Sequence, residues 1–186
     1  MEKTKSIKNF SLVKNICFAF LATLILAISA KIKIPFYPVP MTMQTFVVLL
    51  VGIYFGWRLG MFTVGLYLIE GMVGLPVFAG TPEKGIGIAY FIGPTMGYLV
   101  GFLIAVFLAG FFKFENSFFK NFLKLVFSVS FIYLFGIIWL WFFKGLSTNF
   151  NEIFAIGAKP FLLIELYKLL ILAVLSNLIF KIRPFI

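Results

Sequence analysis

The chain consists of long, continuously apolar stretches separated by short polar ones. Most of the apolar stretches approach the roughly 20 residues that a helix needs to cross a hydrocarbon core about 30 Å thick. A membrane β-strand would instead alternate apolar and polar residues with a period of two. Runs without that alternation satisfy their backbone hydrogen bonds inside helices. The pattern therefore predicts an all-α integral membrane protein.

The apolar stretches divide into six predicted helices. They cover residues 11–30, 43–55, 58–73, 93–112, 120–143 and 160–181. The second and third are short and could form one span, but the sequence GWRLG at 56–60 interrupts their shared run. Glycines beside an arginine favour a tight turn over the centre of a membrane helix. We therefore expect six spans and treat residues 1–186 as one transmembrane domain.

The basic residues orient these spans. With six spans, the termini share one side with Lys3, Lys5, Lys8, Lys14, Arg58, Lys113, Lys120, Lys124, Lys181 and Arg183, and the other side holds Lys31, Lys33, Lys84, Lys144 and Lys159. Ten against five agrees with the excess of Lys and Arg in cytoplasmic loops. Merging the two short helices would reverse the bias. Both termini are thus predicted to be cytoplasmic, in a multi-pass protein of the bacterial cytoplasmic membrane.

Composition agrees with a bilayer environment and excludes several chemistries. The chain is 62% hydrophobic and 12% charged, against roughly 25% charged in soluble domains. Its net charge of +10 does not indicate nucleic-acid binding, because the basic residues lie between apolar runs rather than on one soluble face. With no His and a single cysteine, Cys17, one chain offers neither a disulfide nor a Cys/His metal site. We also find no GxxxxGK[ST] phosphate loop, so we expect no ATPase activity of its own.

Two outer connections are rich in proline and glycine, at 31–42 and 74–92. Proline fixes φ and glycine admits positive φ, so such segments can fold compactly over a site. An ordinary exposed connector has the same composition. From composition alone the two interpretations are equally good.

Glu165 and Lys168 are the strongest candidate functional residues. Ionisable groups inside a membrane helix usually face a partner or a cavity, and the i, i+3 spacing puts these two on one helical face. One interpretation is a self-neutralising pair that only packs the bundle. The other is a polar clamp, in which Glu165 accepts from ligand N–H groups and Lys168 donates to a ligand carbonyl. A cyclic urea offers that combination.

Further polar and small residues are weaker candidates. Thr42 and Gln44 begin the second helix, and a threonine there is more often a cap than a ligand contact. Tyr98 lies at the mouth of the fourth helix, whereas Glu70, at the end of the third, fits the outer cavity or the headgroup interface equally well. In the first helix a stripe of small residues recurs every fourth position, suited to close approach by another helix. Its members are Ala19, Thr23 and Ala27, widened by Ala22 and Ala30.

Four segments resemble the BioY family, the biotin-specific S components of energy-coupling factor (ECF) transporters. They are IPFYPVPMTMQTF at 34–46, YLIEGMVGLPVFAG at 67–80, GPTMGYLVGF at 93–102 and PFLLIELYK at 160–168. The resemblance extends over essentially the whole chain. It departs from the family at Glu165, where an aspartate in a PGD context is usual.

The resemblance implies a six-helix subunit that captures biotin near the outer face, with the first and third loops closing over it. The family's acid and lysine map onto Glu165 and Lys168. Lys84, with Lys31 and Lys33 behind it, is the candidate partner of the biotin carboxylate. The resemblance also implies docking of the small stripe on a membrane scaffold protein that is driven by paired cytoplasmic ATPases.

Other functions remain open at this stage. The chain could serve another vitamin, such as thiamine or riboflavin, because a fold does not fix a function. A membrane enzyme using Glu70 or Glu165 as an acid would lack a histidine, a metal cluster and a nucleophile motif. A ligand-free assembly protein is the last class. We expect a transport subunit with biotin as its ligand and no cofactor.

Overall fold

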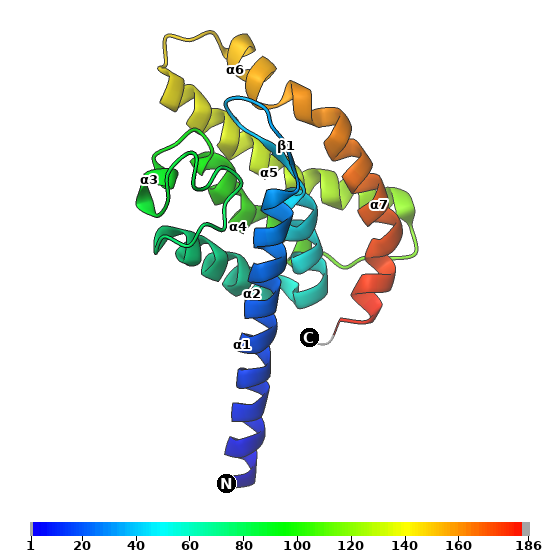
Figure 1. Cartoon of the computed structure of the whole chain (residues 1–186). Helices are drawn as coiled ribbons and strands as arrows, with labels where there is room; N and C mark the ends of the chain where they lie inside the picture. Colours follow the sequence, from blue (N-terminus) through cyan, green and yellow to red (C-terminus); the bar gives the residue numbers. More distant parts are fainter. Residues whose placement is uncertain (1, 184–186) are drawn as a thin grey trace.

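A computed structural model describes the backbone of residues 2–183 and the side chains of residues 13–183. It begins with a long helix, α1 (Glu2–Lys31), whose N-terminal part extends past the other helices (Figure 1). The predicted start at residue 11 is nine residues late. The apolar pattern revealed only the segment that suits a bilayer, and the helix continues into the polar residues before it. Within the described chain, four helices are long and apolar enough to cross a membrane.

The second helix, α2 (Gln44–Met72), is two helices joined at Gly56. This residue has φ 78° and ψ 173°, a backbone conformation that glycine adopts readily because it lacks a Cβ. The chain changes direction sharply there (Figure 1). The prediction of two short helices rather than one straight span is confirmed, with the break inside the predicted GWRLG turn.

Three further helices complete the bundle: α4 (Met96–Phe111), α5 (Phe118–Lys144) and α7 (Leu162–Lys181). Each begins and ends within three residues of its prediction. α4 packs between α2 and α5, and Gly97 and Gly101 bring it close to the α5 backbone. A Cβ at Gly101 would lie 2.6 Å from the Cα of Ile132, so a larger residue would push the helices apart.

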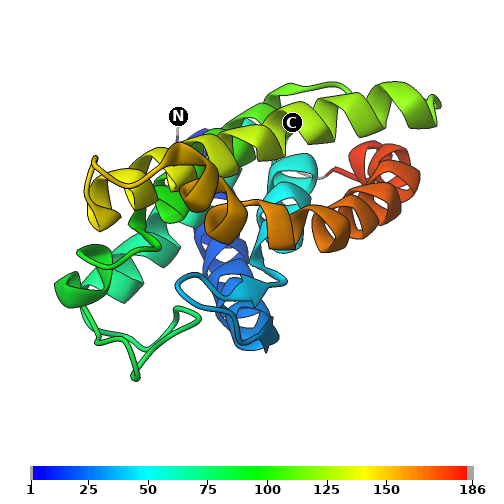
Figure 2. The same cartoon turned by 90° about the horizontal axis from the view of Figure 1, so that it is seen from above.

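The connections contain short elements that the apolar pattern did not predict. The first forms a hairpin of β1 (Lys33–Ile34) and β2 (Met41–Thr42), paired antiparallel with Lys33 opposite Thr42. The second contains α3 (Ile88–Phe91). Between α5 and α7 lie α6 (Phe150–Gly157) and the 3₁₀ turn η1 (Lys159–Phe161). In Figure 2 the hairpin projects beside α1, and α6 leads directly into α7.

The small stripe of α1 packs inside the protein. Ala19 and Thr23 are 0% exposed, and Ala27 is partly buried. Their helix packs against α2, and the Thr23 hydroxyl donates to Glu70 Oε1 at 2.9 Å. In this structure the face that carries Ala19 and Thr23 packs within the chain, and the docking role of the stripe stays a prediction. Small residues allow close helix approach, and here the approaching helix belongs to the same chain.

Candidate ligand-binding site

A cavity lies beneath the hairpin, where α2, α4, α5 and α7 converge. Its lining comprises Val39, Pro40, Met41, Thr42, Gln44, Thr45, Ala79, Tyr90, Thr95, Tyr98, Leu99, Phe102, Ile132, Tyr133, Phe161, Ile164, Glu165 and Lys168. Apolar side chains dominate, with a few polar groups at one end, as in typical small-molecule sites. The cavity measures about 60 Å³, well below the roughly 300–1,000 Å³ of ligand pockets. Admitting a vitamin-sized molecule therefore requires its walls or loops to move outward.

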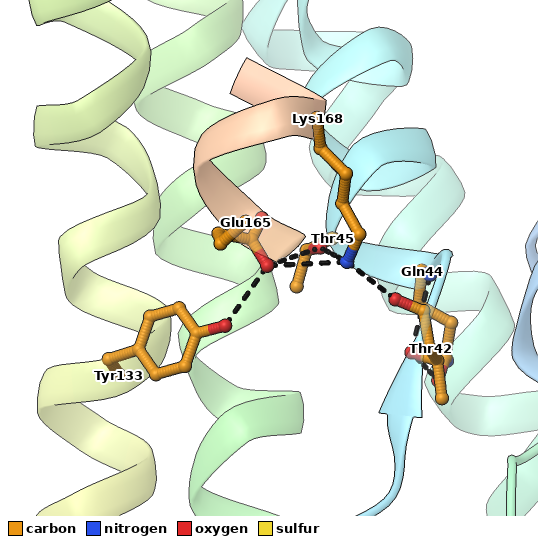
Figure 3. Close-up of polar contacts among 6 residues, drawn as sticks. All are labelled: Thr42, Gln44, Thr45, Tyr133, Glu165 and Lys168. Carbon is orange, nitrogen blue, oxygen red and sulfur yellow. Dashed lines mark hydrogen bonds and ion pairs between the residues drawn. The ribbon is translucent and has the colours of Figure 1, made fainter. Parts of the chain in front are cut away.

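Glu165 and Lys168 form the polar end of this cavity (Figure 3). Both are buried, at 4% and 6% exposure, and their charged atoms lie 3.3 Å apart. Lys168 Nζ also donates to the Thr42 carbonyl at 2.6 Å and to Thr45 Oγ1 at 2.9 Å. These three bonds use all three N–H groups of the ammonium. The predicted location of Glu165 and Lys168 on one helical face is confirmed. Thr42, Thr45 and Glu165 together hold the ammonium group of Lys168.

The two carboxylate oxygens of Glu165 differ in their surroundings. Oε2 accepts from the Thr45 and Tyr133 hydroxyls, each at 3.0 Å, as well as from Lys168. Oε1 is buried and has no hydrogen-bond partner among the described residues. A buried carboxylate oxygen without a donor costs free energy. The site thus offers an unused acceptor beside an ammonium, which suits a ligand carrying both an N–H and a carbonyl.

The other predicted residues of the second and fourth helices also reach the cavity. Thr42 Oγ1 donates to Gln44 Oε1 at 3.1 Å, and Gln44 Nε2 reaches the Tyr67 hydroxyl at 2.8 Å. Tyr98 donates to the Gly157 carbonyl at 2.7 Å, tying α4 to α6. These bonds fix the orientations of Thr42, Gln44 and Tyr98 in the wall of the cavity.

Two residues of the polar cluster were missed. Thr45 lies next to Gln44 at the start of α2 and bridges Glu165 to Lys168. Its hydroxyl at the first turn of an apolar helix was a readable signal. Tyr133 lies in the middle of the aromatic-rich α5 and donates to Glu165. Because that helix is rich in large apolar residues on every face, its sequence does not single out this tyrosine.

Glu70 and Lys84 do not line the cavity. Glu70 accepts a hydrogen bond from Thr23 of α1 and is not among the residues that line the cavity. The ligand role proposed for Glu70 is therefore not supported by its position. Lys84 Nζ donates to the Pro38 carbonyl at 2.8 Å. It connects the second outer connection to the hairpin above the cavity.

Lys84 belongs to a set of three loop-bridging lysines, which we call the lysine clasp: Lys31, Lys33 and Lys84. Lys31 Nζ donates to the Phe78 carbonyl and Lys33 Nζ to the Ala79 carbonyl, both at 2.7 Å. Lys31 and Lys33 donate from residues 31–42 to carbonyls of residues 74–92, and Lys84 donates in the opposite direction, to the Pro38 carbonyl. Partial burial, and then the Lys33 charge, lower the pKa of Lys84. We call these two connections, joined by the clasp, the lid. Composition alone had left open whether they fold over a site or are ordinary connectors.

Together the fold and the cavity define a polytopic helical membrane protein with a buried acid–lysine pair at one end of a cavity beneath its loops. A profile of the BioY family matches residues 1–185, so the chain belongs to the BioY family.

Solved and curated relatives agree with this membership. The probable biotin transporter BioY of Pyrococcus horikoshii is 36% identical over 155 residues, 83% of this chain and 89% of that protein. The biotin transporter BioY of Thermotoga maritima is 34% identical, over 83% of this chain and 88% of that one. The crystal structure of the S-component for biotin from an ECF-type ABC transporter superposes with a TM-score of 0.78 at 27% identity, over 93% and 94% of the two chains. The chain is accordingly a multi-pass protein of the bacterial cytoplasmic membrane.

Proposed function

We propose that this protein captures biotin as the substrate-specific subunit of an ECF-type ABC transporter. The observation that carries the proposal is the buried Glu165–Lys168 pair facing a lidded cavity. Membership of the BioY family and the likeness to a biotin S-component support it. The subunit would bind biotin without changing it chemically and would require no cofactor.

The ureido ring of biotin is complementary to this pair. A ureido N–H would donate to Glu165 Oε1, which accepts no bond within the described protein. The ureido oxygen would accept from Lys168, whose ammonium would exchange one of its present acceptors, such as the Thr42 carbonyl, for the ligand. Bonds involving charged groups are stronger than neutral ones, so orientation of the ring would be well defined. Gln44, Thr42 and Tyr98 would shape the surrounding wall.

The carboxylate of biotin would point toward the lid. Lys84 is our first candidate for its partner, with Lys31 and Lys33 next. Each ammonium of the clasp now donates to backbone carbonyls, which a carboxylate could replace. Opening the lid would break these bonds, and closing it over an anion would form new ones.

Uptake would need partners in the membrane and the cytoplasm. We propose that the termini are cytoplasmic and that a membrane scaffold protein with paired ATPases supplies the energy. The basic residues support this orientation, although the side chains of Lys3, Lys5 and Lys8 lie outside the described ones. Because the stripe of Ala19 and Thr23 is covered by the chain itself, docking of the scaffold on it would require α1 to move away from α2.

A thermal-shift series in detergent tests the ligand. A ligand specific to the folded state stabilises it by RT ln(1 + [L]/Kd). We expect biotin to raise the Tm and thiamine and riboflavin to leave it unchanged. A shift with another vitamin alone would assign the same class of subunit to that vitamin. No shift with any of them would favour a ligand-free assembly protein, and turnover of a compound would favour an enzyme.

Comparison of biotin with its neutral amide tests the lid contact. Loss of the carboxylate should weaken binding to the wild-type protein and have a smaller effect on Lys84→Gln. The contribution should also shrink as salt rises, because partly exposed charges are screened. Equal losses in both proteins would remove Lys84 from the site while leaving the ureido contact intact.

A further inference from the structure

Two hollows are lined by residues of both α5 and α7. These two helices pack against each other and run side by side in Figure 2. The larger is an apolar groove of about 470 Å³, lined by Phe122, Val126, Val129, Ser130, Tyr133, Leu134, Ile137, Phe154, Ala158, Leu162, Glu165, Leu166 and Leu169. The smaller is a polar pocket of about 230 Å³, lined by Glu115, Asn116, Phe118, Asn121, Ala173, Val174 and Asn177. The groove ends at Phe122 and Leu169, and the pocket begins within one helical turn of them. We call the two together the α5–α7 seam.

The groove lies within membrane-spanning segments and faces outward. Leu134, Leu162 and Leu166 are half-exposed along it, and its polar members Tyr133 and Glu165 bond to each other at 3.0 Å. A groove with such a lining, at bilayer depth, is filled by hydrocarbon rather than water.

The length and lining of the groove suit a hydrocarbon chain. From Phe122 to Ile137 the groove follows α5 for about 22 Å at 1.5 Å per residue. An acyl chain laid along it would contact the apolar side chains of α5 and α7 that line it, with carbons about 3.5–4.0 Å apart.

The pocket at the end of the groove is bordered by lysines. Its lining includes one acid, Glu115, and no lysine among the described residues. Three lysines nevertheless contact the lining residues Glu115 and Asn116, namely Lys120, Lys124 and Lys181. Lys120 and Lys124 each lie 3.4 Å from Glu115, and first Lys120, then Lys124, holds the pKa of that carboxyl below its usual range. Lys181 and Asn177 both donate to Asn116 Oδ1. The acid is therefore already neutralised, and the excess positive charge remains for another anion.

We propose that the α5–α7 seam binds one anionic phospholipid, with an acyl chain in the groove and the headgroup phosphate beside Lys120 and Lys181. The seam is apolar at bilayer depth and positively charged where α5 and α7 leave the bilayer. An anionic phospholipid has the same arrangement, with apolar acyl chains inside the bilayer and a charged headgroup at its surface. The lipid would pack against the outer side of the Tyr133–Glu165 contact, whose inner side lines the ligand cavity. The seam would be a structural lipid site next to the ligand site, and its occupancy does not depend on which vitamin is bound.

Native mass spectrometry of the delipidated full chain in detergent tests the proposal. We expect phosphatidylglycerol to be retained in preference to phosphatidylcholine of the same chains. The double variant Lys120→Gln/Lys181→Gln should lose at least about fivefold of the phosphatidylglycerol retention, since each lysine near an anionic surface contributes about 1 kcal/mol, or about fivefold. Inorganic phosphate should not compete, which would separate a lipid site from a simple anion site.

Filling the groove gives a second, independent arm. Val126→Trp places an indole in the groove and should reduce phosphatidylglycerol retention, whereas Leu24→Trp, on the exposed face of α1, should not. Folding of each variant is checked by its melting transition. Equal retention of the two lipids, an unchanged lysine variant or the same effect from both tryptophans would overturn the proposal. Displacement of the lipid only by a co-purified membrane protein would assign the seam to a partner helix instead.

Discussion

At the scale of single residues, the hydrogen bonds of Glu165 and Lys168 determine what the site can bind, because a low-dielectric interior offers few other donors and acceptors. Lys168 has three N–H groups, and all three are bonded. Among the residues that the structure describes, Glu165 Oε2 has three donors and Glu165 Oε1 has none. A buried polar group without a partner is costly, so ligand binding at Oε1 would relieve a cost already present in the free protein.

Lys168→Met tests this arrangement because it keeps the apolar stem and removes the donor. It strands the Glu165 carboxylate and the ligand carbonyl, a loss that typically costs about 2–5 kcal/mol at an interface. We expect biotin affinity in calorimetry to fall at least about tenfold, a change of about 1.4 kcal/mol. Lys159→Met, an exposed lysine at η1, is the matched control and should bind as the wild type. An unchanged Kd in a folded Lys168→Met protein would reduce the pair to a structural ion pair.

At the scale of elements, the sequence predicted the membrane helices well because their lengths follow from the bilayer. The break in α2 was also readable, since Gly56 and Arg58 fit no membrane centre. What the sequence did not predict is which face of a helix points inward. In lipid both faces of a helix are apolar, so the sequence of the Ala19 and Thr23 stripe is the same whether it packs against a partner protein or against α2. In this structure α1 packs against α2. The same ambiguity hid Tyr133 in α5.

The inward-facing stripe changes what a bulky residue in α1 should do. Ala19 is fully buried, so Ala19→Trp overpacks the contact of α1 with α2. Overpacking typically costs about 1–3 kcal/mol, and an indole lies at the upper end of that range. We expect a lower Tm and reduced yield in detergent. Leu24→Trp on the exposed face of α1 should leave the Tm unchanged. A folded Ala19→Trp protein with wild-type Tm that binds biotin but fails in uptake would support the stripe as a docking face.

The hinge of α2 is a second element whose conformation can be tested. Gly56 has a positive φ, and a Cβ there would overlap the guanidinium of Arg183. Arg183 also donates to the Gly110 carbonyl at 2.8 Å, so the end of α7 is fastened to the hinge and to the end of α4. Burial lowers the pKa of its guanidinium.

Gly56→Ala should therefore destabilise the protein. An L-residue held at positive φ with ψ near 180°, a region populated essentially by glycine alone, costs about 1–3 kcal/mol, and displacement of Arg183 adds to this. Gly65→Ala is the control, because Gly65 lies in regular helix and, apart from its chain neighbours and the nearby backbone of its own helix, no heavy atom of the described residues lies within 4 Å of the added Cβ. We expect a lower Tm for the first variant and little change for the second. Equal melting of both would mean that the hinge relaxes without cost.

At the scale of the whole molecule, the cavity, the clasp and the hinge are arranged along one direction. The cavity is lined in part by the hairpin, and the Gly56 hinge lies beside Arg183, just past the end of α7. α7 ends on the side of the molecule from which the start of α1 extends (Figure 1). α2 and α7 each contribute to both ends, through Thr45 and Lys168 above and Gly56 and the Arg183 contact below. A change at the hinge side would thus be transmitted to the polar cluster by two continuous helices.

This arrangement has a function in transport only if its two ends face opposite sides of the membrane, which cysteine labelling tests. Thr81 is buried, so Glu83 and Ser147, both exposed, are the better outer positions, and the exposed Asn116 is the inner one. With Cys17 replaced, a membrane-impermeant maleimide applied to intact cells should label Glu83→Cys and Ser147→Cys. It should label Asn116→Cys only after the cells are opened, because the positive-inside bias places its lysine-rich loop in the cytoplasm. Labelling of Asn116→Cys in intact cells would invert the orientation and place the lysine clasp, with the cavity beneath it, on the wrong side for capture from outside.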